Sequence, residues 1–191
     1  MRTLRSAAGT AIAVLLLALQ VGPAAATTLI RQGLDRLTTD DEVILLGRVL
    51  DIHSYWNAGH TFILTDVHVG PTRVLKGDPA QGEMTFTVMG GSVGDLTTLV
   101  IDGPDLVPGS EYLLFLHHED LPGAVRRLTV GNLVQGVFDV TDSPQGRRAV
   151  SQAARHPLIA DGAGVAEPPG GAEGLLLDQM IDQVRRLAGD H

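Results

Sequence analysis

The chain contains no cysteine among its 191 residues. That absence excludes a disulfide scaffold, a thiolate zinc site, an iron–sulfur cluster and a thiol nucleophile. Aromatic residues make up only 4 %, lysine occurs once, at Lys76, and the net charge is −8. Nucleic-acid phosphates bind clustered Lys and Arg, so this charge disfavours a nucleic-acid partner. What remains is 44 % hydrophobic residues with 23 Gly and 10 Pro, a composition that favours one turn-rich domain with an aliphatic core.

The first 26 residues have the three parts of a secretory signal peptide in the usual order. Arg2 and Arg5 supply the basic part, 11–21 is an apolar run, and Ala24–Ala26 supplies a small-residue cleavage site. The alternatives are a short buried helix or a retained anchor. We expect cleavage after Ala26 and a secreted or periplasmic protein. No later hydrophobic run approaches the length of a membrane span, so we expect no membrane insertion after cleavage.

Residues 41–141 carry the pattern of short antiparallel strands. In 61–69, Ile63, Thr65, Val67 and Val69 alternate with polar residues, which is typical of a strand with one buried face. The longest strand candidate, 43–55, changes phase after Val49, and this predicts a β-bulge. Further strands are predicted at 84–88, 96–101, 112–116, 125–130 and 137–140. The fold class that follows is mainly β: a small antiparallel β-barrel, closed or partly open, over 27–150.

The segments on either side of the barrel have different patterns. Residues 29–38 predict a short helical lead-in. The Gly- and Pro-rich stretch 151–172 predicts a flexible linker. Residues 173–188 predict an amphipathic C-terminal helix with the stripe Leu176, Leu177, Met180, Ile181 and Val184. That stripe packs either on its own barrel or on a partner.

Several residues are candidates for chemistry. His117 and His118 begin the densest group of possible ligands, followed by Glu119-Asp120, and we place the group in a solvated turn. Neighbouring residues at a strand end point to opposite sides, which disfavours one shared metal ion. Strand pairing could also gather the histidines at 53, 60 and 68 into a surface metal site. We expect no cofactor and no bound metal.

The loop Gly90–Gly94 matches the G-x-S-x-G string around Ser92, but a nucleophile elbow needs a following helix and a strand is predicted there. Its predicted role is a tight loop that glycine permits. Tyr55 and Trp56 end the first strand, and Trp56 is the only tryptophan. They form either a lid over one end of the barrel or a contact site for a partner.

Residues 41–140 resemble a group of uncharacterised secreted bacterial proteins with an OB-like or netrin-module-like barrel. The resemblance rests on short motifs: Gly47–Val49, Ser54–Trp56, Thr65–Val69, Val74–Gly77, Gly90–Gly94, Gly103-Pro104, Pro108-Gly109, Phe115-Leu116 and Gln135-Gly136. It implies the barrel fold and an extracellular setting. The animal netrin-type modules, among them the tissue inhibitors of metalloproteinases, are similar in architecture only. In the inhibitors, the resemblance implies, an N-terminal cysteine chelates the protease zinc through its amine and carbonyl, whereas the expected new N-terminus here is Thr27-Thr28.

The function we expect is that of a secreted or periplasmic binding module without catalysis. Its expected partner is another secreted or envelope protein, and modulation or inhibition of a co-secreted protease is the most concrete version. The expected binding residues are Tyr55, Trp56, Gly90, Gly91, Ser92, His117 and His118. Two alternatives stay open: a metal-dependent or serine hydrolase using the histidines or Ser92, and a structural protein of the cell envelope.

Overall fold

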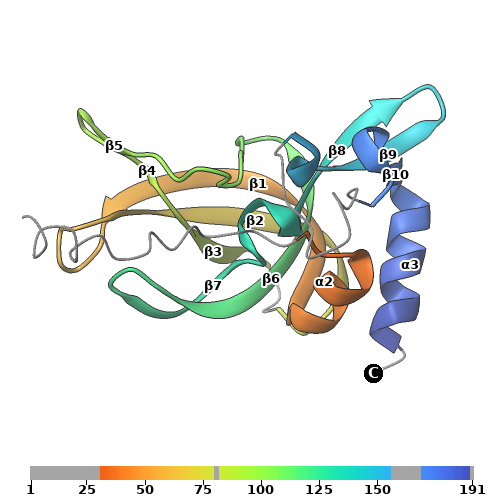
Figure 1. Ribbon diagram of the computed structural model, residues 1–191, viewed down its shortest axis with the longest axis horizontal. Coiled ribbons are helices and arrows are strands. Elements are labelled where there is room, and N and C mark those ends of the chain that lie inside the picture. The colour runs from red at the N-terminus through yellow and green to blue at the C-terminus, as the bar shows by residue number, and fades with distance from the viewer. Residues whose placement is uncertain (1–30, 80–81, 156–168, 190–191) are drawn as a thin grey trace, which may run out of the picture.

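The structure, a computed structural model, describes residues 31–79, 82–155 and 169–189. It is mainly β, as the sequence predicts, and its large sheet is antiparallel with the strand order β10-β9-β8-β6-β1-β2-β3. The elements are α2 (Leu34–Asp40), β1 (Val43–Trp56), β2 (Ile63–Lys76), β3 (Met84–Met89), β4 (Gly91–Val93), β5 (Leu96–Thr98), β6 (Glu111–Leu121), β7 (Ala124–Val130), β8 (Val137–Ser143), β9 (Gly146–Ser151), β10 (Leu175–Leu176) and α3 (Leu177–Gly189). Strands β4 and β5 form a separate hairpin, which lies at the opposite end of the molecule from α3 (Figure 1).

Strand β1 is the centre of the sheet because it pairs with β2 along its length and with β6 over its first half. The bulge predicted after Val49 is confirmed: Val49 pairs with Val69, and the next paired residue is Asp51. Leu50 is therefore left out of the ladder. Two further register shifts lie at Ile44/Leu45 and Leu46/Gly47. Bulges bend and twist a strand, so these three irregularities curve the sheet around its central strand.

The sheet has an apolar core on each side, because neighbouring residues in a strand point to opposite faces. Leu45 and Leu46 on β1 show the division. Leu45 joins a core inside the curved sheet, together with Val67, Phe86 and Leu114. Leu46 joins the core on the other side, which α2 and α3 cover. Its members are Leu37, Ile44, Leu113, Phe115, Phe138, Ala149, Leu177, Met180, Ile181 and Val184.

A closed barrel is not found. Strand β6 shares one edge between two partners: Tyr112–Leu114 pair with β8, and 116–121 pair with β7. Strand β7 then lies near β3, the far strand of the sheet. No backbone ladder joins β7 to β3 anywhere in the described ranges. The curved sheet is thus open along this seam, and the sequence pattern could not show it because alternation is the same in open and closed sheets.

The C-terminal helix is present, but it begins at Leu177 instead of residue 173, since Leu175–Leu176 pair with β9 as β10. Its buried residues Leu177, Met180, Ile181 and Val184 belong to the core against the sheet, so the apolar stripe packs on the protein's own fold. Helix α2 covers Leu34–Asp40, later than the predicted 29–38. In the part of the chain described, no helix has the length and hydrophobicity needed to cross a membrane.

Several boundaries differ from the prediction. Strand β9 was missed, and β2 continues through Gly70 and Pro71 to Lys76. Of the predicted strand 96–101, only Leu96–Thr98 is paired. The start of the predicted linker is ordered, since Gln152 and Ala153 are buried in a 3₁₀ turn. The predicted signal peptide, 1–26, and most of the linker lie outside the described residues.

Candidate functional site

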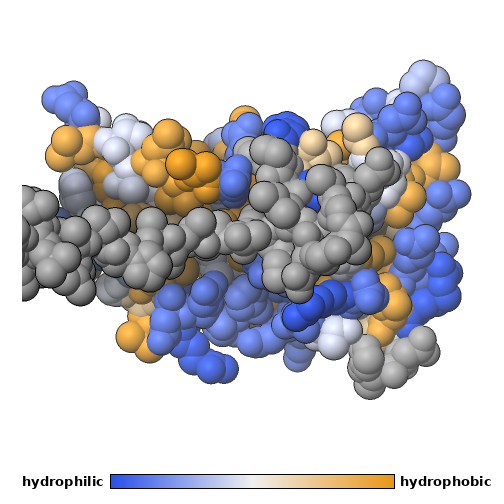
Figure 2. Space-filling view, viewed as in Figure 1, coloured by the Kyte–Doolittle hydropathy of each residue, from blue (hydrophilic) through white to orange (hydrophobic). Residues whose placement is uncertain are grey.

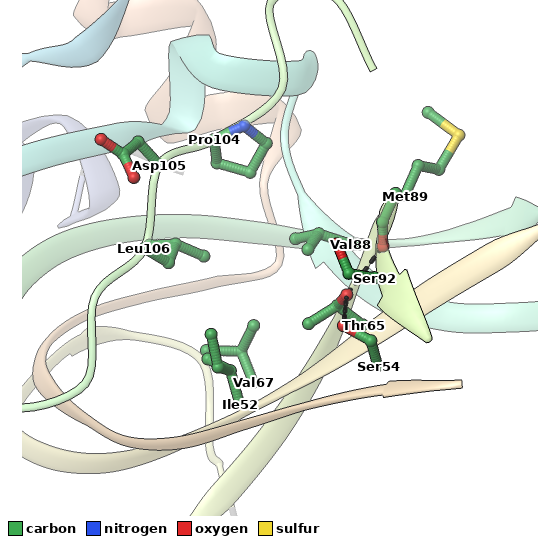
Figure 3. Close-up of a pocket in the computed structure, with 12 residues that line it drawn as sticks. Ile52, Ser54, Thr65, Val67, Val88, Met89, Ser92, Pro104, Asp105 and Leu106 are labelled. Carbon is green, nitrogen blue, oxygen red and sulfur yellow. Dashed lines mark hydrogen bonds between the residues drawn. The ribbon is translucent and has the colours of Figure 1, made fainter. Parts of the chain in front are cut away.

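A pocket of about 360 Å³ lies between the large sheet and the β4–β5 hairpin. Strands β1, β2 and β3 provide its floor, and the segment before β6 provides the opposite wall (Figure 3). Three of the predicted binding residues, Gly90, Gly91 and Ser92, line it. The other lining residues are Ile52, Ser54, Thr65, Val67, Val88, Met89, Pro104, Asp105 and Leu106.

A chain of hydroxyl groups crosses the floor of this pocket. The Thr65 hydroxyl donates to the backbone oxygen of Gly90 over 2.7 Å. The Ser54 and Thr65 hydroxyl oxygens lie 2.8 Å apart (Figure 3). Ser54 and Thr65 face each other in the β1–β2 ladder. The backbone N–H of Gly90 also donates to Ile63 over 2.9 Å. Residue 90 is therefore fixed through both of its backbone polar groups.

Glycine at position 91 is required by the same hydroxyl chain. Its φ of +125° lies in the region that other residues rarely adopt. A Cβ there would overlap the Thr65 hydroxyl and stand 2.5 Å from that of Ser54. The predicted glycine loop is thus the entry into a hairpin, because β4 begins at Gly91 and the chain reverses at Gly94, where φ is +60°.

Ser92 is an exposed residue of β4. Its hydroxyl lies 2.8 Å from that of Thr97 on the paired strand. The residues after it form strand β5 rather than the helix of a nucleophile elbow. Within the ranges described, no imidazole hydrogen bonds to Ser92. Its hydroxyl is a cross-strand partner in the hairpin.

The outer wall of the pocket is held by Gln152, a residue that the sequence analysis assigned to the linker. Its side-chain oxygen accepts from the Asp105 N–H over 2.9 Å, and its side-chain nitrogen donates to the Asp105 carbonyl over 2.7 Å. The same nitrogen lies 2.7 Å from the Asp139 carboxylate on β8. Arg155 completes the arrangement by pairing with Asp139. The buried Gln152 side chain thus fixes both the N–H and the carbonyl group of Asp105 in the pocket wall.

Tyr55 and Trp56 lie at the end of β1 and do not line the pocket. The Tyr55 hydroxyl donates to Asp66 over 3.0 Å, and Thr87 donates to the same oxygen over 2.7 Å. Burial and the neighbouring Asp66 carboxylate raise the pKa of Tyr55 above its usual value. The Trp56 ring stacks on His60 with centroids 6.2 Å apart. Both aromatic side chains therefore pack on the β1–β2 hairpin itself.

His117 and His118 lie in strand β6, so placing them in a turn was wrong. The hairpin of β6 and β7 extends beyond them to Leu121, and His117 pairs with Thr129 in its ladder. As expected for neighbours in a strand, the two rings have different partners. His117 Nδ1 lies 3.0 Å from Asp41, and His118 Nδ1 lies 2.8 Å from Glu42.

Asp41 is the most perturbed acidic group in the described chain. Its side chain is only 1 % exposed, and one carboxylate oxygen has no hydrogen-bond partner. Burial raises its pKa to about 6, against the opposing effect of the hydrogen bond from His117. By contrast, the hydrogen bond from His118 lowers the pKa of the exposed Glu42. The two acid–histidine pairs join the end of α2 to β6.

The seven predicted binding residues do not form one site. Gly90–Ser92 line the pocket, Tyr55-Trp56 pack at the hairpin end, and His117-His118 pair with 41 and 42. The histidines at 53, 60 and 68 also have separate partners: Tyr55, Trp56 and Thr85. Over the described ranges, no group of three or more His, Asp or Glu side chains is arranged to hold a metal ion.

Exposed aliphatic side chains gather on the β4–β5 hairpin and the segment after it. Leu96 is 61 % exposed, Leu99 84 % and Ile101 81 %. We call these three residues the aliphatic arm. Figure 2 shows hydrophobic residues in the region of this hairpin, at the upper left of the view. The sequence predicted a paired strand here, whose side chains would be half buried. Pairing ends at Thr98, so the last two arm residues lie outside any ladder.

In comparisons with known proteins, no family model matches the chain, and no curated protein matches it either.

Proposed function

We propose that the protein is an exported binding module without catalysis, and that it binds another secreted or envelope protein through the aliphatic arm. The scaffold we propose is a partly open barrel of the OB or netrin-module kind, formed by the curved strands β1, β2, β3, β6 and β7. The signal-peptide pattern of residues 1–26 supports export.

The exposure of the aliphatic arm carries this proposal. Single exposed apolar side chains are common on protein surfaces, whereas apolar side chains gathered on one projection are typical of interaction sites. Fully burying three Leu or Ile side chains contributes on the order of 5 kcal/mol before the entropic cost of association. That amount offsets only the lower estimates of this cost, so the arm would be the main contact of a complex that also needs further contacts around it.

The β4–β5 hairpin also suits a contact role by its position. It projects from the end of the molecule opposite α3 (Figure 1). Its base is fixed to the sheet by the hydrogen bonds of Gly90 and Thr65. A projection with a rigid base loses little conformational entropy when its partner binds, and that favours affinity.

The experiment compares two charged substitutions with a matched control. The arm variant is L99D/I101D. The control is Val125→Asp on β7, because Val125 is also 81 % exposed. Each mature protein is used as bait for the secreted fraction of the cells that produce it, and any captured partner is purified and titrated by calorimetry.

We expect one stoichiometric partner whose affinity falls at least tenfold with L99D/I101D and is unchanged with Val125→Asp. All three proteins should have the same melting temperature, because the substituted side chains are exposed. The proposal is wrong if the arm variant binds its partner as tightly as the control, or if no protein is enriched over an unrelated bait.

A further inference from the structure

We propose that the pocket between the sheet and the β4–β5 hairpin binds a small apolar group that carries one N–H or O–H donor, and that the Ser54 hydroxyl oxygen accepts this hydrogen bond. The inference does not depend on the proposed protein partner, because none of Leu96, Leu99 and Ile101 lines the pocket.

The direction of the hydroxyl chain determines which hydrogen bonds the pocket can make. A carbonyl oxygen only accepts, so the single hydroxyl hydrogen of Thr65 is committed to Gly90. Thr65 must then be the acceptor in its contact with Ser54, and Ser54 the donor. With its one hydrogen used, the Ser54 oxygen has only acceptor capacity left. The floor of the pocket therefore selects a ligand group that donates.

The rest of the lining determines the remaining chemistry of the ligand. Apolar side chains surround the hydroxyls: Ile52, Val67, Val88 and Leu106 (Figure 3). The carboxylate of Asp105 lies at the wall and is the only charged side chain of the lining. This carboxylate is 75 % exposed and lies 3.9 Å from Arg155. The lining itself holds no cationic side chain and the chain has a net charge of −8, and both disfavour anionic ligands. A volume of about 360 Å³ lies within the range of small-molecule sites.

The pocket is preformed rather than created by a ligand. Its floor consists of paired residues, with Ser54 opposite Thr65 and Thr65 opposite Val88 in continuous ladders. Its wall is fixed by the buried Gln152. Gly91 leaves free the space beside the two hydroxyls that any other residue would fill. A preformed acceptor avoids the cost of ordering the site on binding.

The test uses three bicyclic probes of similar shape that differ in one group: indole, which only donates, 1-indanone, which only accepts, and indene, which does neither. Binding is followed by NMR through the backbone amide shifts of residues 90–92. In the wild-type protein we expect indole to bind roughly three- to tenfold more tightly than the other two, the ratio that one net hydrogen bond supplies.

Three variants make the test specific. Ser54→Ala removes the acceptor, so indole should bind no better than indene. Thr65→Val frees the Ser54 hydrogen, so the affinity for 1-indanone should rise above that for indene. Ser92→Ala is the matched control, because Ser92 also lines the pocket but its hydroxyl bonds to Thr97. It should leave the order of the probes unchanged.

The donor group that enters the pocket could belong to a side chain of a protein partner or to a free small molecule. A tryptophan-containing tripeptide distinguishes these two sources. Tighter binding of the tripeptide than of indole assigns the group to a partner's side chain, and tighter binding of indole assigns it to a free small molecule. The inference is overturned if indene or 1-indanone binds wild-type protein as tightly as indole, if Ser54→Ala keeps the full preference for indole, or if no probe shifts these amides. Because the arm side chains do not line this pocket, failure of the probe experiment can be distinguished from failure of the proposed function.

Discussion

The buried Asp41 makes the stability of the fold depend on pH, and Asp41→Asn should remove that dependence. Burial raises the pKa of this carboxyl from 3.8 to about 6 in the folded protein. The folded state therefore holds the proton more tightly than the unfolded state. The free energy of unfolding should then rise as the pH falls through 6, and this contribution should level off below 3.8. At about 1.36 kcal/mol per pKa unit, the full effect is about 3 kcal/mol.

The groups around Asp41 set the conditions of the experiment. His117 lies 3.0 Å away, and Asp40 and Lys76 also act on its charge. An asparagine at position 41 keeps an acceptor for the His117 N–H but cannot ionise. We would measure urea unfolding between pH 3.5 and 7.5 by circular dichroism, and plot the difference in unfolding free energy between wild type and variant. The wild type should gain about 2.5 kcal/mol relative to the variant from neutral pH to pH 3.8, and the rest of the effect below it.

The matched control is Asp40→Asn, one residue earlier, where the carboxylate is 49 % exposed and pairs with Arg36 in an exposed contact. This exposed contact contributes little to stability, so the difference of Asp40→Asn from wild type should change much less over the same range than that of Asp41→Asn. The reasoning is refuted if the Asp41→Asn difference is as flat as that of the control, because the carboxyl would then titrate alike in the folded and unfolded states.

Two further substitutions test particular contacts. Gly91→Ala should lower the free energy of unfolding by about 1–3 kcal/mol, because its φ is positive and a methyl group would overlap the hydroxyls beside it; urea unfolding measures this, and Gly94→Ala should cost less, since its φ of +60° is also positive but a Cβ at 94 meets nothing within 4 Å. Lys76→Met should cost about 1 kcal/mol, because the ammonium group donates to the last carbonyls of α2 at 2.6 and 3.1 Å; an unchanged melting temperature would show that this cap is dispensable.

The features that the sequence predicted correctly are local ones. The alternation in 63–69 appears as a strand in which all four residues of the predicted face are buried, and Leu64 of the other face is buried as well. The change of phase after Val49 marks a real bulge. Four of the five residues of the predicted helical stripe are buried on α3, whereas Leu176 lies in β10. In each case the pattern records which side of one element faces the core, and that information lies within a few neighbouring residues.

The features that were missed depend on residues far apart in the chain. Asp41 acquires its raised pKa from burial by distant parts of the fold, against the lowering effect of His117, which is 76 positions away. Gln152 is recognisable as a wall residue only once Asp105, 47 positions earlier, lies beside it. Strand β9 contains the adjacent charged residues Arg147-Arg148 and shows no strand pattern by itself, and it is recognised only through its pairing with β8 and β10. The open seam between β3 and β7 is likewise a matter of tertiary geometry.

The most direct test of the proposed function is hydrogen–deuterium exchange of the protein with and without its captured partner. We expect the amides whose exchange slows in the complex to centre on residues 91–101, which include the aliphatic arm. Protection confined to α3 or to the β6–β7 hairpin, with 91–101 exchanging as in the free protein, would contradict it.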